Sequence, residues 1–193
     1  MPASSPLTPD TDFSRSLDSA TLTEVQASVI SGGNMPSPSA PSDVVRAVAA
    51  GVSLLITDSL TEQERQAHLD HLAGLYAEHT DVRHPLAPTG DIPLRTRTEI
   101  RRHFAGIPVQ THEVDGFEPV GQVHATADPE VVVFEFSYAG AVNGNPFALP
   151  CIFVTRVRDG VIVESRDYAD HVGMARVFGR LGELATALAA DSR

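Results

Sequence analysis

Lysine is absent from this 193-residue sequence, so all 14 residues of the lysine-plus-arginine class are arginines. This absence excludes enzymes that form a Schiff base through a lysine, and it excludes the phosphate-binding lysine of a P-loop. Cysteine occurs once, at Cys151, which excludes an intrachain disulfide and a metal cluster held by thiolates. No apolar run in the sequence approaches the ~20 residues that span a bilayer.

Basic charge is also scarce. The sequence has 25 acidic residues against 14 arginines, which gives a formal net charge of −11. Such a charge repels phosphate backbones and anionic lipid, so we expect neither nucleic acid nor a membrane as a partner. The N-terminal segment has no apolar core of the kind that signal peptides contain, so we expect a cytoplasmic protein.

The composition divides the chain near residue 42. Met1–Pro9 and Asn34–Ser42 are rich in proline and serine, which disfavour both helix and sheet. We therefore expect residues 1–42 to be a mostly disordered tail, in which Leu17–Ile30 is a candidate for one short helix. Residues 43–193 are long enough to bury a substantial core, so we expect them to form a single domain.

The first part of this domain has the sequence pattern of helices. Ser42-Asp43 can cap a helix whose apolar residues recur at helical spacing. Thr61–Glu64 matches a capping box and opens a second helix. Thr96 or Thr98 can cap a third, shorter helix that ends at Gly106. We expect the second helix to run as far as the apolar pair Leu75-Tyr76.

After the third helix, the apolar residues alternate with a period of two, which is typical of strands. Asn143-Gly144 and Asp159-Gly160 are signals for two-residue hairpin turns. The expected strands are Phe117–Thr126, Val131–Tyr138, Phe147–Val157 and Val161–Tyr168. Ala175–Ala190 is expected to be one closing helix. Helices followed by antiparallel strands predict an α+β fold.

Four segments together resemble a known family: Leu75–Pro85, the Thr98–Phe104 helix, Asn143–Leu149 and Asp159–Tyr168. Their order and spacing are similar to those of the nuclear transport factor two-like superfamily, in its SnoaL-like polyketide cyclase and ketosteroid isomerase-like branch. The resemblance covers about Val44–Phe178. It implies a cone-shaped (cystatin-like roll), curved antiparallel sheet packed on N-terminal helices, plus a C-terminal helix. It also implies a pocket inside the cone and a homodimer that pairs through the sheet.

The resemblance points to two site residues. The isomerase branch has its proton-transferring carboxylate just before a proline, and that position is His84 here; an imidazole can also take up a proton near neutral pH. Limonene epoxide hydrolases are similar at Arg166-Asp167-Tyr168, where the aspartate helps to position a water. The second isomerase acid falls on Phe153, and the hydrolases' arginine–aspartate pair falls on Phe134 and Phe136. These departures argue against either mechanism in unchanged form.

Strand periodicity extends this assignment to the pocket wall. A period of two places Asp167 on the same face as Ser165, and it gives Phe134, Phe136 and Tyr138 one shared face, which the resemblance assigns to the pocket. We expect Tyr138 to present its hydroxyl there. The expected apolar lining of the substrate site is Phe104, Phe117, Phe134, Phe136, Phe147 and Phe153.

Metal binding is the alternative that eight histidines suggest. His68 and His71 lie three residues apart on the second helix, with Asp70 between them, and could bind a cation. No third ligand follows at a suitable spacing, so we expect exposed helix histidines. We therefore predict no metal and no cofactor.

The leading hypothesis is a cofactor-independent, SnoaL-like enzyme that isomerises or cyclises a small hydrophobic substrate, polyketide-like or steroid-like. His84 would take up a proton, Asp167 would orient the imidazole or return the proton, and Tyr138 would donate to the developing oxyanion. One alternative is a non-catalytic small-ligand-binding or dimerisation module, in which Asp167 only pairs with an arginine. Another is an epoxide hydrolase of the limonene-epoxide-hydrolase type.

Overall fold

The computed structural model describes residues 40–57, 59–108 and 113–191. Most of the expected tail, including the candidate helix Leu17–Ile30, lies outside the described residues. Pro41 and Ser42, which we had assigned to the tail, are the first residues of helix α2 (Pro41–Thr57). The folded domain therefore begins at least two residues earlier than expected.

The next two helices both begin at capping boxes, the first as predicted at Thr61 and the second at Thr96, one of the two caps that the sequence offered. In α3 (Glu62–Gly74), the Thr61 side chain accepts from the backbone N–H of Glu64, and the Glu64 carboxylate accepts from that of Thr61. Thr96 and Glu99 form the same reciprocal pair at the start of α4 (Arg97–Ala105). These bonds satisfy backbone donors that the first turn of a helix leaves free.

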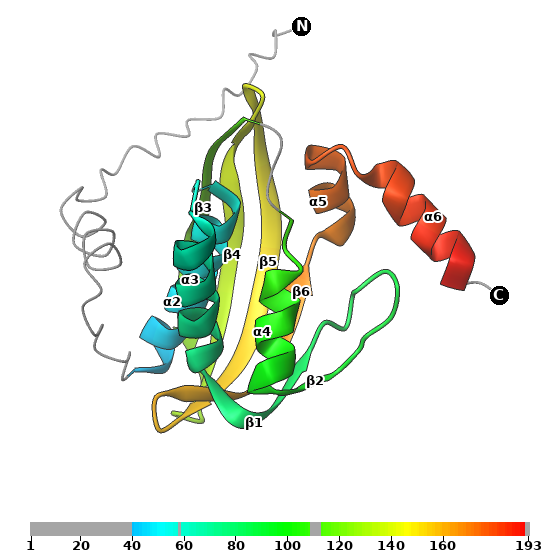
Figure 1. The fold of residues 1–193 in the computed structure, drawn as a ribbon. Coiled ribbons are helices and arrows are strands. Elements are labelled where there is room, and N and C mark those ends of the chain that lie inside the picture. Colours follow the sequence, from blue (N-terminus) through cyan, green and yellow to red (C-terminus); the bar gives the residue numbers. More distant parts are fainter. Residues whose placement is uncertain (1–39, 58, 109–112, 192–193) are drawn as a thin grey trace, which may run out of the picture. The chain divides into compact units, whose positions relative to one another are not determined.

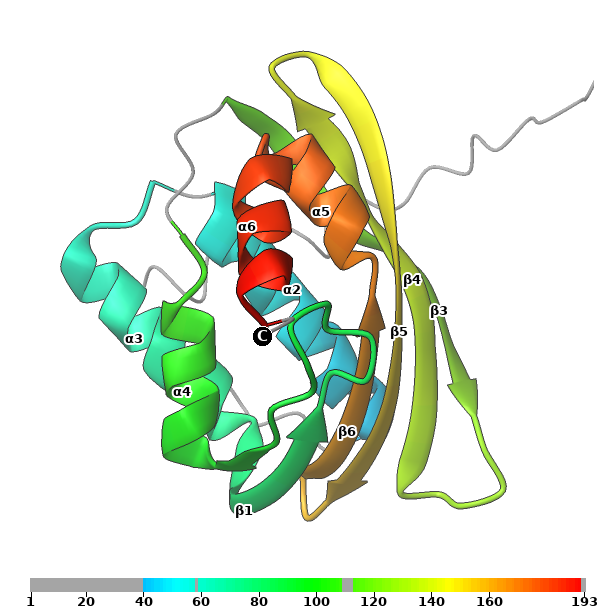
Figure 2. The same cartoon turned by 90° about the vertical axis from the view of Figure 1, so that its right-hand side faces the viewer.

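A curved, six-stranded sheet forms the other layer, in the order β2-β1-β6-β5-β4-β3. Its strands are β1 (Tyr76–Arg83), β2 (Leu94–Thr96), β3 (Val114–Ala125), β4 (Val131–Val142), β5 (Asn145–Arg158) and β6 (Val161–Ala169). The helices pack on one face of this sheet (Figures 1 and 2). The expected α+β fold with a curved sheet is thus confirmed.

Both predicted hairpin turns are present. Asn143 and Gly144 have φ values of 50° and 76°, and Asp159 and Gly160 have values of 52° and 77°. Two consecutive residues with positive φ are the requirement of a type I′ turn, which Asn-Gly and Asp-Gly meet at low cost.

Two parts of the sequence analysis were wrong about secondary structure. The second helix ends at Gly74 rather than including Tyr76, which begins β1 and pairs with β6 in a parallel arrangement; the sheet is therefore not wholly antiparallel. The expected closing helix Ala175–Ala190 is two helices, α5 (His171–Val177) and α6 (Leu181–Asp191). Gly179 lies between them with φ 67°, a left-handed conformation that ends the first helix.

The inner face of β3, β4 and β5 packs under α2. Five rings on or near this face are at most 5% exposed and form what we call the aromatic cluster: Phe117, Phe134, Phe136, Tyr138 and Phe178. The ring centroids of Phe134 and Phe136 are 4.2 Å apart, while Glu135 between them is exposed. The predicted face assignment of β4 is confirmed. Among the described residues, no helix is both long and apolar enough to cross a membrane.

Candidate active site

The two residues that the resemblance singled out lie side by side. His84 is the first residue after β1, and Asp167 lies in β6, which pairs in parallel with β1 so that Arg83 is opposite Arg166. The residues that follow Arg83 and Arg166 on these two segments are His84 and Asp167, which therefore lie next to each other. The imidazole Nε2 of His84 is 3.9 Å from Oδ2 of Asp167. Parallel pairing thus joins segments that are more than eighty residues apart in the sequence.

Asp167 is a buried carboxyl group with one partner at each oxygen. The Ser165 hydroxyl donates to Oδ1, and it also lies 3.0 Å from the hydroxyl of Thr155 on β5. Oδ2 faces His84. Burial raises the pKa of Asp167 to about 7, although the Ser165 hydrogen bond and the charge of Arg166 oppose this rise. At neutral pH the group is therefore poised between acid and carboxylate.

Asp167 is not the ion-pair partner of the neighbouring arginine, which was the alternative to a catalytic role. The guanidinium of Arg166, its chain neighbour, lies 2.9 Å from the Asp81 carboxylate and 3.0 Å from that of Glu164. In the described part of the chain, the one ion-pair contact of Asp167 within 4 Å is with His84. A buried carboxylate without a cationic partner is costly, which is why its pKa rises.

His84 is fixed through its backbone. Its N–H donates to Oδ1 of Asp91 at 2.9 Å, and Oδ2 of Asp91 also lies 3.4 Å from the guanidinium of Arg83. The His84 carbonyl accepts from the N–H of Ala87 at 2.9 Å, which closes a turn around Pro85. Asp91 was not identified from the sequence, because its contact with His84 depends on the path of the intervening loop.

Two more histidines lie close to His84, and we call these three the histidine cluster: His84, His103 and His171. His103 on α4 stacks on His84 with ring centroids 4.8 Å apart. His171 begins α5, and its Nε2 is buried without a hydrogen-bond partner in the described structure. The sequence analysis gave neither residue a role. No local signal links them to His84, because they come from the separate helices α4 and α5.

Burial also sets the protonation of these histidines. Burial, together with the neighbouring His103 and His171, lowers the pKa of His84 to about 4, against the opposing charge of Asp91. Burial likewise lowers the pKa of His103 and of His171. At pH 7 His84 is therefore a neutral imidazole beside a carboxyl group that can gain or lose a proton. Such a pair can perform general acid–base chemistry.

Tyr138 lies in the aromatic cluster, and its hydroxyl is engaged by the helix above it. The hydroxyl donates to the carbonyl of Ala49 in α2 at 3.3 Å. Its ring stacks on Phe117, with centroids 4.4 Å apart. Burial raises the pKa of Tyr138 well above its usual value. The structure shows no hydrogen bond between this hydroxyl and either His84 or Asp167.

The six phenylalanines expected to line the site divide into two groups. Phe117, Phe134 and Phe136 belong to the aromatic cluster, and Phe147 packs against Phe117 at its edge. The other two lie near the acid–base pair. Phe153 is directly opposite Asp167 in the β5–β6 register. Phe104 packs against the ring of His103, with centroids 5.8 Å apart.

His68 is a structural residue. It is 6% exposed, and its Nε2 lies 2.8 Å from the carbonyl of Gly51, so the expectation that it is exposed was wrong. Within residues 40–57, 59–108 and 113–191, no group of three or more histidine, cysteine, aspartate or glutamate side chains is arranged to hold a metal ion.

One comparison with known proteins identifies a family. The family model described as a SnoaL-like domain matches residues 59–165. No curated protein matches the sequence. A solved structure from Bacillus subtilis, provisionally classed as an isomerase, shares 23% identity and a TM-score of 0.56 over 72% of this chain and 93% of that one. A second, a hypothetical protein with a ketosteroid isomerase-like fold from Catenulispora acidiphila in complex with trimethylamine, shares 20% identity and a TM-score of 0.47 over 71% of this chain and 92% of that one.

Proposed function

Because this chain belongs to the SnoaL-like domain family, within the nuclear transport factor two-like superfamily, we propose that it is a cofactor-independent isomerase or cyclase of a small hydrophobic molecule. The substrate would be of polyketide-like or steroid-like size. The observation that carries this proposal is the pairing of His84 with Asp167 at 3.9 Å in a buried setting. Solved structures at this level of identity support the fold alone, so the chemistry is argued from the pair.

The two groups suit different roles. The sequence analysis gave the role of base to His84, with Asp167 assisting. A pKa of about 7 makes the Asp167 carboxylate a stronger base than the His84 imidazole, whose pKa is about 4. We therefore assign proton transfer to Asp167. His84 then acts as a neutral hydrogen-bond donor, since a neutral imidazole can stabilise a developing oxyanion.

The reaction begins at a carbon next to a carbonyl group. The Asp167 carboxylate takes a proton from that carbon, and the C–H electron pair moves into an enolate whose oxygen accepts a hydrogen bond from His84. In an isomerisation the enolate is conjugated with a carbon–carbon double bond, and Asp167 returns the proton to the far carbon of that double bond, which moves toward the carbonyl. In a cyclisation, the enolate carbon bonds to an electrophilic carbonyl carbon of the same molecule, and the new alkoxide takes the proton from Asp167, which restores the carboxylate. The two outcomes share the first step.

Deuterium exchange tests this shared step without knowledge of the product. A panel of uncharged hydrophobic ketones is incubated with the enzyme in heavy water, and deuterium uptake at the α-carbon is followed by mass spectrometry. We expect Asp167→Asn and His84→Ala to lower the enzyme-catalysed exchange rate at least tenfold, because general acid–base catalysis contributes ~10²–10⁴-fold. Asp115→Asn and His79→Ala change exposed residues of the same types and are the matched controls.

The pH dependence of exchange tests the role of Asp167. As a base it must be deprotonated, so kcat/KM rises with pH up to about 7 and is then constant. A rate that falls above pH 7 would instead make Asp167 the acid and contradict the assignment. Unchanged rates in both site variants would leave the alternative of a ligand-binding module.

Epoxide hydrolysis has less support. The positions that correspond to the hydrolases' arginine–aspartate pair are Phe134 and Phe136, which are buried in the aromatic cluster. These side chains cannot activate a water. Incorporation of labelled oxygen from water into a product would nevertheless favour hydrolysis over cyclisation.

We also propose that two copies pair through the outer face of the sheet. The described helices all lie on the other face (Figure 2). Val120 and Ile152 are 58% and 40% exposed, and both lie on this outer face, opposite Ser137 and Glu135 of β4. Light scattering should show a dimer for the native chain and a monomer for Ile152→Arg, because a buried unpaired charge opposes association. A native monomer would contradict this proposal.

A further inference from the structure

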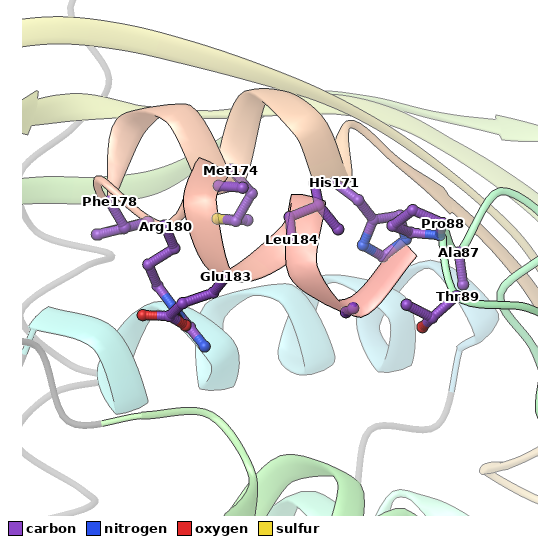
Figure 3. A pocket seen from close by; sticks show the side chains of 11 residues that line it. Ala87, Pro88, Thr89, His171, Met174, Phe178, Arg180, Glu183 and Leu184 are labelled. Atoms are coloured by element: carbon purple, nitrogen blue, oxygen red, sulfur yellow. Dashed lines mark hydrogen bonds and ion pairs between the residues drawn. The ribbon is translucent and has the colours of Figure 1, made fainter. Parts of the chain in front are cut away.

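A groove of about 460 Å³ lies next to the histidine cluster, between the segment Ala87–Thr89 and the helices α5 and α6. Pro88, Thr89 and His171 stand at one end of it, and Arg180 and Glu183 stand at the other (Figure 3). Met174 and Leu184 lie between these ends. None of the six phenylalanines expected from the sequence lines this groove.

Both segments that carry the acid–base pair continue into the groove. Ala87 follows His84 by three residues, in the turn that the His84 carbonyl closes. His171 follows Asp167 by four residues, and it is a member of the histidine cluster as well as a lining residue. The end of the groove at His171 is therefore the end nearest the proposed chemistry.

The charge of the groove is balanced. The guanidinium of Arg180 pairs with the Glu183 carboxylate at 3.0 Å. His171 is neutral at pH 7 because burial lowers its pKa. The remaining lining is apolar except for Thr89: it consists of Ala87, Pro88, Met174, Ala175, Phe178, Leu184 and Ala187. A charged ligand would lose hydration here without gaining an unpaired counter-charge.

The polar groups at the His171 end of the groove favour a ligand with one oxygen function there. Thr89 has a hydroxyl there, and Nε2 of His171 has no hydrogen-bond partner in the described structure. Buried polar atoms are nearly always paired, so one without a partner calls for an explanation. The volume lies within the range of ~300–1,000 Å³ that is typical of small-molecule sites.

We propose that this groove binds the elongated, uncharged and mostly apolar part of the substrate that extends beyond the reacting carbonyl, and that a second hydroxyl or carbonyl oxygen on this part points toward Thr89 and His171. The inference rests on the proposed function, since it names the substrate class of that site. One wall of the groove, α5 and α6, lies after residue 165, where the family match ends. The groove therefore gives this chain a specificity element beyond the matched domain.

A matched pair of dyes tests the binding of this class directly. N-phenyl-1-naphthylamine is uncharged and apolar, and 1-anilinonaphthalene-8-sulfonate has the same ring system with a sulfonate added. The chain contains no tryptophan, so dye fluorescence is free of a tryptophan background. We expect the uncharged dye to bind at least tenfold more tightly than the sulfonate.

Two variants of α6 locate the bound dye. Leu184 lines the groove, whereas Leu181 on the same helix is 43% exposed and does not line it. We expect Leu184→Arg to weaken the binding of N-phenyl-1-naphthylamine at least tenfold, and Leu181→Arg to leave it within twofold of the native value. Circular dichroism confirms that both variants remain folded. In the exchange assay, Leu184→Arg should raise KM and leave kcat within threefold.

Three results would overturn the inference. Equal dye affinity of the two α6 variants would place the dye elsewhere. Equal affinity for the two dyes would remove the preference for an uncharged ligand. Dissociation of a dimer by Leu184→Arg alone, with dye binding intact, would make the groove a contact between copies. Dye titration requires no turnover, so a failure of the exchange assay tests the proposed function separately from the groove.

Discussion

The two halves of the inner sheet face differ in what covers them. Under α2, the aromatic cluster on β3–β5 is packed to exposures of 5% or less. The β1–β6 end, which we call the polar half, also has an apolar core, but a carboxyl group and neutral imidazoles are buried beside that core, next to a groove. One curved sheet thus holds one half whose rings form an apolar cluster and one half in which a titratable pair is buried.

The two halves contribute differently: the apolar half supplies folding free energy, and the polar half holds the acid–base pair. Rings that pack against each other and against a helix bury large apolar areas, and they dominate the free energy of folding. The polar half has the opposite effect, because burial shifts Asp167 and His84 toward their neutral forms and so opposes folding. A protein retains such a destabilising pair where the pair has a task.

The largest expected effect is a loss of stability in the apolar half. Phe134→Ala should lower the free energy of unfolding by about 3–5 kcal/mol, because Phe134 is 1% exposed and the surrounding rings cannot close the cavity. Urea denaturation followed by circular dichroism measures this loss. Glu135→Ala changes the exposed neighbour and should alter stability by less than about 0.5 kcal/mol.

Dye binding to the same variant would show that the substrate does not bind at the aromatic cluster. We expect Phe134→Ala to leave the affinity for N-phenyl-1-naphthylamine within twofold at a temperature where the variant is folded. A near-native stability combined with a large change in dye affinity would instead return the aromatic cluster to the role of substrate lining that the sequence analysis gave it.

A smaller effect, with a distinct pH signature, is expected in the polar half. The pKa of Asp167 is about 7 in the folded chain against 3.8 in its unperturbed state, so the folded state binds more protons between these values. Native stability from this group therefore falls as pH rises from about 4 to 7. Asp167→Asn does not titrate, so its stability relative to the native chain should increase by roughly 2–4 kcal/mol between pH 4 and pH 8.

Urea denaturation of both proteins across this range provides the measurement. The lowered pKa of His84 has the opposite effect, because it makes stability fall as the pH drops from 6.5 toward 4. Both proteins contain His84, so this effect largely cancels in the difference between their unfolding free energies. If the unfolding free energies of the native chain and Asp167→Asn changed in parallel with pH, burial would not raise the pKa of Asp167. The contrast between the two halves would then disappear.

The halves also differ in how far the sequence predicts them. Local signals predicted both two-residue hairpin turns and the capping box at Thr61, and they gave Thr96 as one of two possible caps of α4, because those structures are decided by a few adjacent residues. Alternation correctly identified the inward face of Phe134 and Phe136. It could not show that α2 fills the space above them, since that depends on the packing of a distant segment.

The polar half depends on contacts that no local pattern contains. Tyr76–Arg83 follows a helix and was not expected as a strand, yet its parallel pairing with β6 is what brings His84 to Asp167. The resemblance supplied these two residues, whereas spacing alone did not. His103 and His171 reach His84 from separate helices, so only the assembled fold reveals the cluster.

The smallest expected effect concerns Tyr138, the residue that the sequence placed in both halves. Its ring belongs to the aromatic cluster and its hydroxyl donates to the Ala49 carbonyl. Tyr138→Phe removes one hydrogen bond and keeps the ring, so urea denaturation should show a loss of about 0.5–1.5 kcal/mol. The deuterium exchange rate should stay within twofold of the native rate. A tenfold loss of exchange with little loss of stability would mean that the hydroxyl leaves Ala49 and donates to the substrate oxyanion, and the boundary between the two halves would then run through Tyr138 itself.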